Sequence, residues 1–411
     1  MLRRLTVKSF KSLGDVSIEF PRLAVLFGPN AAGKSNLLDA VQALSRIGTQ
    51  RTVADALGER IRGYPIEAFS FPEEGLAGLL SSSTAAFDLS ADLTRKKDFL
   101  RYRARIEVTP GSGALAVSDE YLCALAKDGT PKGTPAIESV EGKLRLRRKS
   151  EGGKPRYEPI RQNYALLSDA RLGKPLYPTI ETARAELSDW RTYYLDPRVA
   201  MRAAQPPSDV RDIGPLGGKI APFLYRLRAE HPKAFQAVSR TLRSIVPSIE
   251  EVNVDLDERR GTLDILVRQD GTDYSSRIVS EGTLRVLALC AIAVNPWGGS
   301  LLAFEEPENG VHPRRLELIA ELLMSLALEQ ERQVIVTTHS PLFCDAVLKR
   351  ARERQDDIRL FNVRRKGRAT VVQPFRIADP LFSDSEIAAA LTAGTEDGLF
   401  EGLLLRGMLD E

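Results

Sequence analysis

Alternating apolar and polar residues predict antiparallel strands over much of the N-terminal half of the chain. The alternation runs through residues 2–8 and 16–20, and again through 85–93 and 101–108, which together have the pattern of a hairpin. Shorter strand patterns follow at 121–126, 143–148, 156–160, 252–256 and 262–268. The region between about 85 and 160 is therefore expected to be mostly β, unlike a simple βαβ domain.

Apolar residues at helical spacing predict helices mainly in the C-terminal half. One helix follows residue 35 and ends near Ile47, and others are expected at 180–190, 218–230, 232–245, 281–294, 314–330 and from Ser385 to the end. Apolar runs typical of buried strands occupy residues 23–27, 300–304 and 333–338, and residues 190–195 are expected to form a buried strand or a turn. The Gly-, Pro- and Ser-rich residues 48–84 are expected to be irregular, and residues 358–374 to form a hairpin.

Composition places the chain among ordinary globular proteins. Its 411 residues suffice for about two or three domains, and 43% of them are hydrophobic and 27% charged. The net charge of +3 neither favours nor excludes a polyanionic partner. The three cysteines are far apart, which argues against disulfides and structural zinc. Without a signal-peptide pattern or a run of about 18 apolar residues, we expect a cytoplasmic protein with no membrane segment.

A phosphate-binding motif stands between the strand 23–27 and the helix that follows it. Residues 28–35 read Gly-Pro-Asn-Ala-Ala-Gly-Lys-Ser and fit G-x-x-x-x-G-K-[ST]. The glycines let backbone N–H groups turn inward on an anion, and the helix N-terminus adds partial positive charge. Lys34 is expected to reach the β- and γ-phosphates and assist catalysis, and Ser35 to bind Mg²⁺. The nucleotide-binding residues predicted here are Asn30, Ala31, Ala32, Gly33, Lys34, Ser35 and Asn36.

Two adjacent carboxylates follow the apolar run 301–304. At the end of such a strand, Glu305 can face Mg²⁺ through its water shell, and Glu306 can orient and deprotonate the attacking water. A solvated Glu-Pro turn is the alternative, but the phosphate loop upstream favours the catalytic interpretation.

His339 follows the apolar strand 333–338. A neutral imidazole there can hydrogen-bond a γ-phosphate and the attacking water. Most isolated histidines are structural, but ligands bind at the carboxyl ends of parallel strands, which favours a catalytic role for His339.

Ser280, Glu281 and Gly282 precede the helix expected at 281–294. A hydroxyl and N–H groups at a helix N-terminus form an anion site. From these residues alone, simple helix capping by Ser280 is the preferred interpretation.

Taken together, these motifs resemble those of the ABC-type ATPases, in order and spacing. The similarity is greatest to the branch with SMC proteins, RecF and OLD-family nucleases, and within it to the stand-alone predicted AAA-family ATP-binding proteins. It rests on the phosphate loop, Ser-Glu-Gly-Thr at 280–283, Glu-Glu-Pro-Glu-Asn-Gly-Val-His-Pro at 305–313 and Thr-Thr-His-Ser at 337–340. It covers roughly residues 1–50 and 275–345, with weaker likeness around 190–197.

The resemblance implies an ATP-dependent homodimer. Ser280, Glu281 and Gly282 would contact the γ-phosphate of ATP bound to the opposite subunit, so that two chains enclose two ATP molecules head to tail. Residues 308–310 and His312 would lie at the seam. Gln162 is the candidate for the glutamine that the family uses to bind nucleotide and Mg²⁺. Glu305 in place of Asp, and Ser-Glu-Gly-Thr in place of Leu-Ser-Gly-Gly-Gln, argue against a transporter subunit.

What the ATPase acts on remains open between two interpretations. The first is DNA repair, DNA maintenance or phage defence, with the basic strand 143–149 binding DNA phosphates. The second is a regulatory scaffold that holds and releases a separate effector protein without contacting DNA. Residues after Ser340 show no acidic cluster like that of the OLD nuclease domain, and no heptad array predicts a coiled coil.

The expected fold is a mixed α/β, ABC-type P-loop ATPase. Residues 1–174 and 296–411 are predicted to form a nucleotide-binding core lobe with a mixed β-sheet. Residues 175–295 are predicted to form a more helical lobe that carries the Ser280–Thr283 motif.

Overall fold

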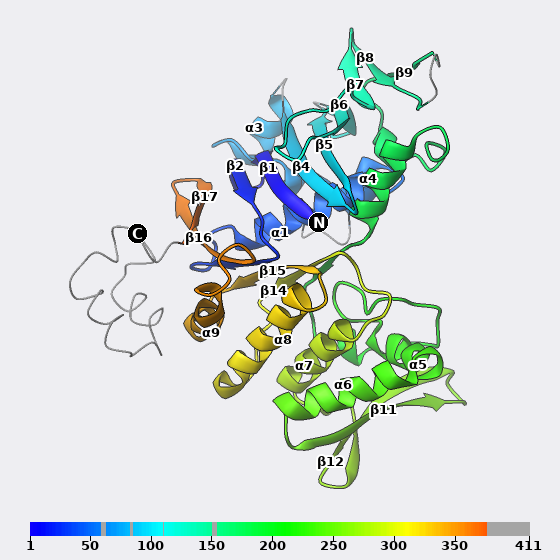
Figure 1. Ribbon diagram of the computed structural model, residues 1–411, viewed down its shortest axis with the longest axis vertical. Helices are drawn as coiled ribbons and strands as arrows, with labels where there is room; N and C mark the ends of the chain where they lie inside the picture. Colours follow the sequence, from blue (N-terminus) through cyan, green and yellow to red (C-terminus); the bar gives the residue numbers. More distant parts are fainter. Residues whose placement is uncertain (59–62, 83–84, 110, 150–153, 376–411) are drawn as a thin grey trace, which may run out of the picture. The chain divides into compact units, whose positions relative to one another are not determined.

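The computed structural model describes residues 1–58, 63–82, 85–109, 111–149 and 154–375 (Figure 1). The chain divides into two compact units. Of the described residues, the first contains those within 1–21, 29–190 and 363–373, and the second contains those within 22–28, 191–362 and 374–375. The helix expected from Ser385 lies outside the described residues.

An eight-stranded sheet forms the frame of the first unit. Its order is β2-β1-β4-β5-β6-β7-β8-β9, and each adjacent pair is antiparallel. The bounds are β1 Leu2–Phe10, β2 Leu13–Glu19, β4 Ala86–Arg95, β5 Asp98–Val108, β6 Leu115–Ala124, β7 Ile137–Val140, β8 Lys143–Leu146 and β9 Arg156–Pro159. The predicted hairpin is confirmed, because Phe87 pairs with Ile106 and Leu89 with Ala104.

Two helices pack against the apolar face of this sheet, α1 (Lys34–Ile47) and α4 (Pro178–Ser188). Alternate residues of β4 and β5 are buried on that face, as their sequence pattern predicts. The described residues between 48 and 82 are more regular than expected. They contain α2 (Val53–Leu57), a 3₁₀ turn (Pro65–Ala68) and α3 (Gly75–Ser81). The side chain of Thr52 caps the N-terminus of α2.

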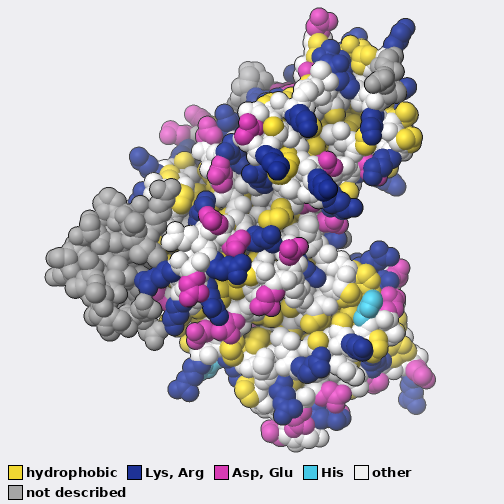
Figure 2. Space-filling model, viewed as in Figure 1, with side chains coloured by type: hydrophobic (Ala, Val, Ile, Leu, Met, Phe, Trp, Pro, Cys, Tyr) yellow, Lys and Arg dark blue, Asp and Glu magenta, His cyan; other side chains and the backbone are white. Residues whose placement is uncertain are grey.

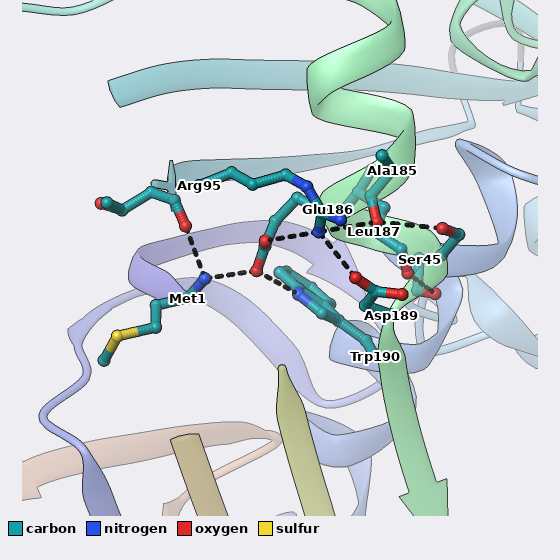
Figure 3. Close-up of polar contacts among 10 residues, drawn as sticks. Met1, Ser45, Arg95, Ala185, Glu186, Leu187, Asp189 and Trp190 are labelled. Carbon is teal, nitrogen blue, oxygen red and sulfur yellow. Dashed lines mark hydrogen bonds and ion pairs between the residues drawn. The ribbon is translucent and has the colours of Figure 1, made fainter. Parts of the chain in front are cut away.

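A buried carboxylate fixes the end of α4 to neighbouring strands (Figure 3). Glu186 is only 1% exposed and accepts hydrogen bonds from Trp190 Nε1 and Arg95 Nη1, both at 3.2 Å, and from the amino group of Met1. Arg95 Nη1 also donates to Asp189 Oδ2 at 2.7 Å. Several donors thus replace the water that Glu186 loses on burial.

A parallel sheet forms the centre of the second unit. Strands β14 (Leu301–Glu305), β15 (Gln333–Thr338), β3 (Leu23–Phe27) and β16 (Ile358–Lys366) lie side by side and point the same way. β10 (Trp190–Tyr193) precedes β14 in the order, and β16 continues into the hairpin strand β17 (Ala369–Pro374). The continuous burial of β3 and β15 follows from their apolar sequences.

Helices and a small antiparallel sheet complete the second unit. The helices are α5 (Ile220–Glu230), α6 (Pro232–Ile245), α7 (Glu281–Ala293), α8 (Leu316–Leu328) and α9 (Pro341–Ala351). The sheet contains β11 (Ile249–Asp257), β12 (Thr262–Gln269) and β13 (Thr272–Ser275). Helix α7 is buried on nearly every side because it is apolar all round, and it shares one core with β3 and β14.

The two units divide the chain differently from the two predicted lobes. Residues 296–362 group with residues 191–295, because β14 and β15 share their core with α7. β3 also belongs to this unit, because its pairing partners are β15 and β16. Among the described residues, no helix is long and apolar enough to cross a membrane.

Candidate functional site

The register of three strands brings the predicted motifs to one edge of the parallel sheet. Glu305 of β14 pairs with Thr337 of β15, and Thr338 pairs with Phe27 of β3. The next residue along the chain is Glu306 after β14, His339 after β15 and Gly28 after β3. The catalytic candidates and the start of the phosphate loop therefore follow the carboxyl ends of neighbouring parallel strands, where α/β proteins bind ligands.

The phosphate loop has the backbone that its glycines predict. Gly28 and Gly33 have φ of 147° and 102°, and Ala31 has φ of 62°. Gly33 caps α1 without a side chain, and the first turn of α1 has no acidic residue. Lys34 is 5% exposed, and its Nζ donates to the Pro29 carbonyl at 2.9 Å. Lys34 and the N-terminus of α1, which are the two predicted sources of positive charge, thus lie in the same tight loop.

Two hydroxyl groups that sequence reasoning missed stand behind this loop. Thr370 Oγ1 donates to the Ala32 carbonyl at 2.9 Å and lies 2.6 Å from Ser12 Oγ. A Cβ at residue 33 would lie 2.0 Å from Thr370 Oγ1, so Gly33 is required for close approach as well as for its φ. Asn36 Nδ2 donates to Ser12 Oγ at 2.7 Å, which ties this predicted nucleotide-binding residue to the same support.

Glu306 is held by polar neighbours from two directions. Its Oε1 lies 3.2 Å from His339 Nδ1, and its Oε2 accepts from Asn309 Nδ2 at 2.6 Å. Its backbone N–H donates to the Thr337 carbonyl at 2.9 Å, although φ of Glu306 is +42°, which is unusual for a residue other than glycine. The structure therefore brings the predicted base and the predicted histidine together.

Glu308 is a buried acid next to this pair. It is 5% exposed and accepts a hydrogen bond from Thr338 Oγ1, while its Oε2 has no hydrogen-bond partner. Burial raises the pKa of the Glu308 carboxyl. The family resemblance implies that residue 308 lies at the dimer seam, but nothing in its spacing indicates that the carboxyl is buried.

The Ser280 motif begins α7 as a capped helix. Ser280 Oγ accepts from the Thr283 N–H at 3.2 Å and lies 2.8 Å from Thr283 Oγ1. The half-exposed Glu281 carboxylate lies 3.7 Å from Arg198 Nε. These contacts confirm Ser280 as an N-cap, and the predicted contact of Ser280, Glu281 and Gly282 with a nucleotide stays a prediction.

The other predicted residues have simpler surroundings. Gln162 pairs through its backbone with Val117 next to β6, and its binding of nucleotide and Mg²⁺ stays a prediction. Asn30 and Ala31 are exposed on the loop, whereas Ala32 is buried. His312 accepts the Arg314 N–H at 3.3 Å and caps a short 3₁₀ turn, a structural role.

Opposite charges alternate across the polar face of the eight-stranded sheet. Arg101 pairs with Asp92, its neighbour across the strands, and Arg105 with Asp88 at 2.7 Å. Further pairs on this sheet are Arg4–Glu19, Lys8–Asp15 and Arg103–Asp119. Figure 2 shows Lys and Arg side chains interspersed with Asp and Glu on the visible surface. Such cross-strand pairs stabilise the sheet and leave little local excess of positive charge.

The basic strand predicted at 143–149 is partly neutralised in the same way. Arg145 and Arg147 both donate to Glu138 Oε1, at 2.6 and 2.9 Å. Arg148 Nε donates to Tyr177 Oη at 3.2 Å. Lys143 and Lys149 are exposed. The cations that stand out toward solvent are therefore fewer than the sequence of this strand indicates.

Comparison with known proteins identifies relatives for most of the chain. The sequence model of the family AAA_21, described as "AAA domain, putative AbiEii toxin, Type IV TA system", matches residues 23–345. This range contains the phosphate loop and every other predicted catalytic residue.

Further similarities cover a smaller part of the chain or concern the fold alone. Over 98 residues the chain is 33% identical to the DNA replication and repair protein RecF of Streptococcus pneumoniae strains CGSP14 and D39, covering 23% of this chain and 24% of each relative. The chain therefore matches about a quarter of the length of these curated relatives. Two SMC head structures, each solved with a domain of ScpA, share the fold. The first has a TM-score of 0.52 and 16% identity, and the match covers 92% of this chain and 98% of that structure. The second has a TM-score of 0.53 and 13% identity, and the match covers 94% of this chain and 99% of that structure. The second is derived from Pyrococcus furiosus.

Proposed function

Because the chain belongs to this AAA-domain family, whose members are ABC-type P-loop ATPases like SMC and RecF, we propose that it is a Mg²⁺-dependent switch. ATP binding closes a head-to-tail homodimer, and hydrolysis opens it. The switch acts in DNA repair or maintenance, as the similarity to RecF suggests. The observation that carries the proposal is the strand register, which sets Glu306, His339 and Gly28 at one edge of a parallel sheet.

Each residue of the proposed site has a role that its chemistry supports. The loop 28–35 binds the phosphates, and Lys34 exchanges the Pro29 carbonyl for phosphate oxygens. Glu306 accepts the proton of the attacking water, while His339 and Asn309 orient its carboxylate. His339 also contacts the γ-phosphate. Ser280, Glu281 and Gly282 contact ATP that is bound to the second copy.

The residues offered for Mg²⁺ fit that ion. Ser35 supplies a hydroxyl, and Glu305 supplies a carboxylate at the end of β14. Mg²⁺ takes oxygen ligands and usually binds through one or two protein groups together with phosphates and water. When bound, the ion neutralises charge that develops on the phosphates.

A second candidate function is a regulatory scaffold that holds and releases an effector protein. The pairing of Arg145 and Arg147 with Glu138 favours it, because these guanidinium groups are less available to DNA phosphates. The toxin–antitoxin system in the family description is also compatible with an effector partner.

The variant Glu306→Gln tests the switch. Glutamine has nearly the shape of glutamate but cannot accept the proton, so hydrolysis should fall by about 100-fold or more, within the range expected for loss of a general base. ATP binding should remain, and the variant should elute as a dimer from a sizing column with ATP and Mg²⁺. Glu321→Gln, on the exposed face of α8, is the matched control and should behave as wild type. If Glu306→Gln stays monomeric while it binds ATP, the dimer proposal fails.

A further inference from the structure

The N-terminal part of α7 contacts the loop that carries Glu306 at two points, through Arg285 and Gly282. Arg285 Nη1 donates to the Glu306 carbonyl at 3.2 Å, and Nη2 donates to the Leu195 carbonyl at 3.3 Å. Gly282 lies against the far end of the loop, where an added Cβ would stand 2.3 Å from the Gly310 carbonyl oxygen. The helix that begins with the Ser280–Thr283 motif therefore touches both ends of loop 306–310 in its own chain.

This loop has features that favour a second conformation. Glu306 has a positive φ, which costs energy for a residue with a side chain. Glu308 Oε2 and Arg285 Nε are both buried without a hydrogen-bond partner. Burial lowers the pKa of the Arg285 guanidinium, and the nearby Glu308 carboxyl opposes that shift. A shift of the loop that pairs Arg285 with Glu308 would satisfy both atoms at once.

We propose that Arg285 is a positioning residue that transmits the state of the Ser280–Thr283 motif to the catalytic base of the same chain. The inference rests on the proposed function, in which this motif contacts the ATP of the second copy while Glu306 acts on the ATP of its own chain. Docking of the motif shifts α7, and Arg285 and Gly282 carry that shift to loop 306–310. Glu306 reaches its productive position only when α7 is docked, so the two sites of a dimer hydrolyse ATP in a coupled way.

Steady-state kinetics of Arg285→Met test the positioning role. Because a displacement of about 1 Å can cost about 100-fold in rate, kcat should fall by about 10- to 100-fold. KM and the ATP dissociation constant should change by less than about 3-fold, because the lost interaction matters after binding. Arg285→Lys should recover part of kcat, because one ammonium can replace one of the two carbonyl contacts. It also keeps the test valid if the methionine variant does not fold.

Arg332→Met is the matched control. Arg332 is similarly buried and donates to the Ile292 and Asn295 carbonyls near the other end of α7, at 3.3 and 2.7 Å. Its loss removes the same kind of contact from the same helix but does not touch loop 306–310. We expect kcat of Arg332→Met within about 2-fold of wild type at a temperature where both variants are folded. A wild-type kcat in Arg285→Met, or an equal fall in both variants, would overturn the proposal.

Mixed dimers test whether the coupling runs within one chain. Glu306→Gln chains bind ATP without hydrolysing it and keep Arg285, so the partner's motif can still dock on their nucleotide. In a mixed dimer of Glu306→Gln and Arg285→Met chains, the functional ATP site lies on the Arg285→Met chain. Coupling within the chain predicts a rate well below that of the reference mixture of Glu306→Gln with wild type. Equal rates in the two mixtures would mean that Arg285 acts only on the partner's nucleotide, which contradicts the inference.

Different results would contradict the proposed function and the coupling inference. If the wild-type protein neither hydrolyses ATP nor dimerises with it, the proposed function itself is wrong. If the wild type does both and Arg285→Met matches it in kcat, only the coupling inference is wrong.

Discussion

At the scale of single residues, the candidates for the chemistry can be predicted from the sequence, but the groups that support them cannot. Lys34, Glu306 and His339 stand in motifs whose residue types, spacing and order together favour a role in ATP hydrolysis. Ser12 and Thr370 are ordinary hydroxyl residues, separated by 358 positions, and only the fold brings them to the back of the phosphate loop. No local pattern marks such residues, because their role depends on tertiary contacts alone.

Thr370→Val measures what this support contributes. Valine keeps the shape of threonine but removes the hydrogen bonds to the Ala32 carbonyl and to Ser12. With about 1 kcal/mol for each lost bond, the ATP dissociation constant should rise by about 5- to 30-fold. Calorimetric titration with ATP gives this value, and Thr272→Val on the exposed strand β13 is the control. An unchanged affinity in Thr370→Val would show that the loop keeps its shape without this hydroxyl.

At the scale of elements, the long periodic segments could be predicted and the short ones could not. Strands β1, β4, β5 and β15 and helices α1, α6 and α7 match their predictions closely. Strands β7 and β13 have only four residues each, too few to show a period. Helix α9 was missed although its start carries a signal, since Ser340 caps it and Pro341 follows at the first position.

The side chain of Glu120 connects strand β6 to residues 166 and 167, and its ionisation predicts that stability depends on pH. Its carboxylate accepts the N–H groups of Leu166 and Leu167 and the hydroxyl of Tyr102. Burial nevertheless raises the pKa of Glu120 from 4.5 to about 7. The folded protein therefore binds this proton more tightly than the unfolded chain does, and stability falls as pH rises from about 4.5 to 7. At about 1.4 kcal/mol per pH unit, the loss amounts to about 3 kcal/mol.

Chemical unfolding of wild type and Glu120→Gln between pH 5 and 7.5 checks this effect. Glutamine does not titrate, so the variant should lack the part of the pH dependence that Glu120 contributes, whatever its absolute stability. The free energy of unfolding of the wild type should decline relative to the variant across this range. Parallel pH profiles for the two proteins would contradict the assignment.

At the scale of the whole molecule, the division into units was not predictable from the sequence. The chain passes from one unit to the other within the phosphate motif, between Gly28 and Pro29. Sequence motifs are read as continuous segments, whereas strand pairing assigns β3 to the unit of β14 and β15. The surface charge is likewise a property of the assembled sheet, because Arg145 meets Glu138 only across paired strands.

Salt-dependent DNA binding distinguishes the two candidate functions. If the ATPase acts on DNA, duplex DNA should stimulate ATP hydrolysis, and the stimulation should fall steeply as the salt concentration rises. The double variant Lys143→Ala/Lys149→Ala should reduce the slope of log affinity against log salt by about 2, since each lost phosphate contact counts for about 1. Lys233→Ala/Arg240→Ala, on the exposed face of α6, is the charge-matched control. If DNA does not stimulate hydrolysis and no salt-dependent DNA binding is found, the ATPase does not act on DNA, and a protein effector is favoured.

The two hydroxyl groups that support the phosphate loop lie outside the segment by which the family is recognised. The family similarity spans residues 23–345 and includes every recognised motif. Ser12 lies before that span and Thr370 lies after it, yet both contact the phosphate loop region. A fragment trimmed to the recognised segment would keep all of its motifs and lose both groups that back the loop. The contacts that support the phosphate loop therefore extend beyond the stretch by which its relatives are recognised.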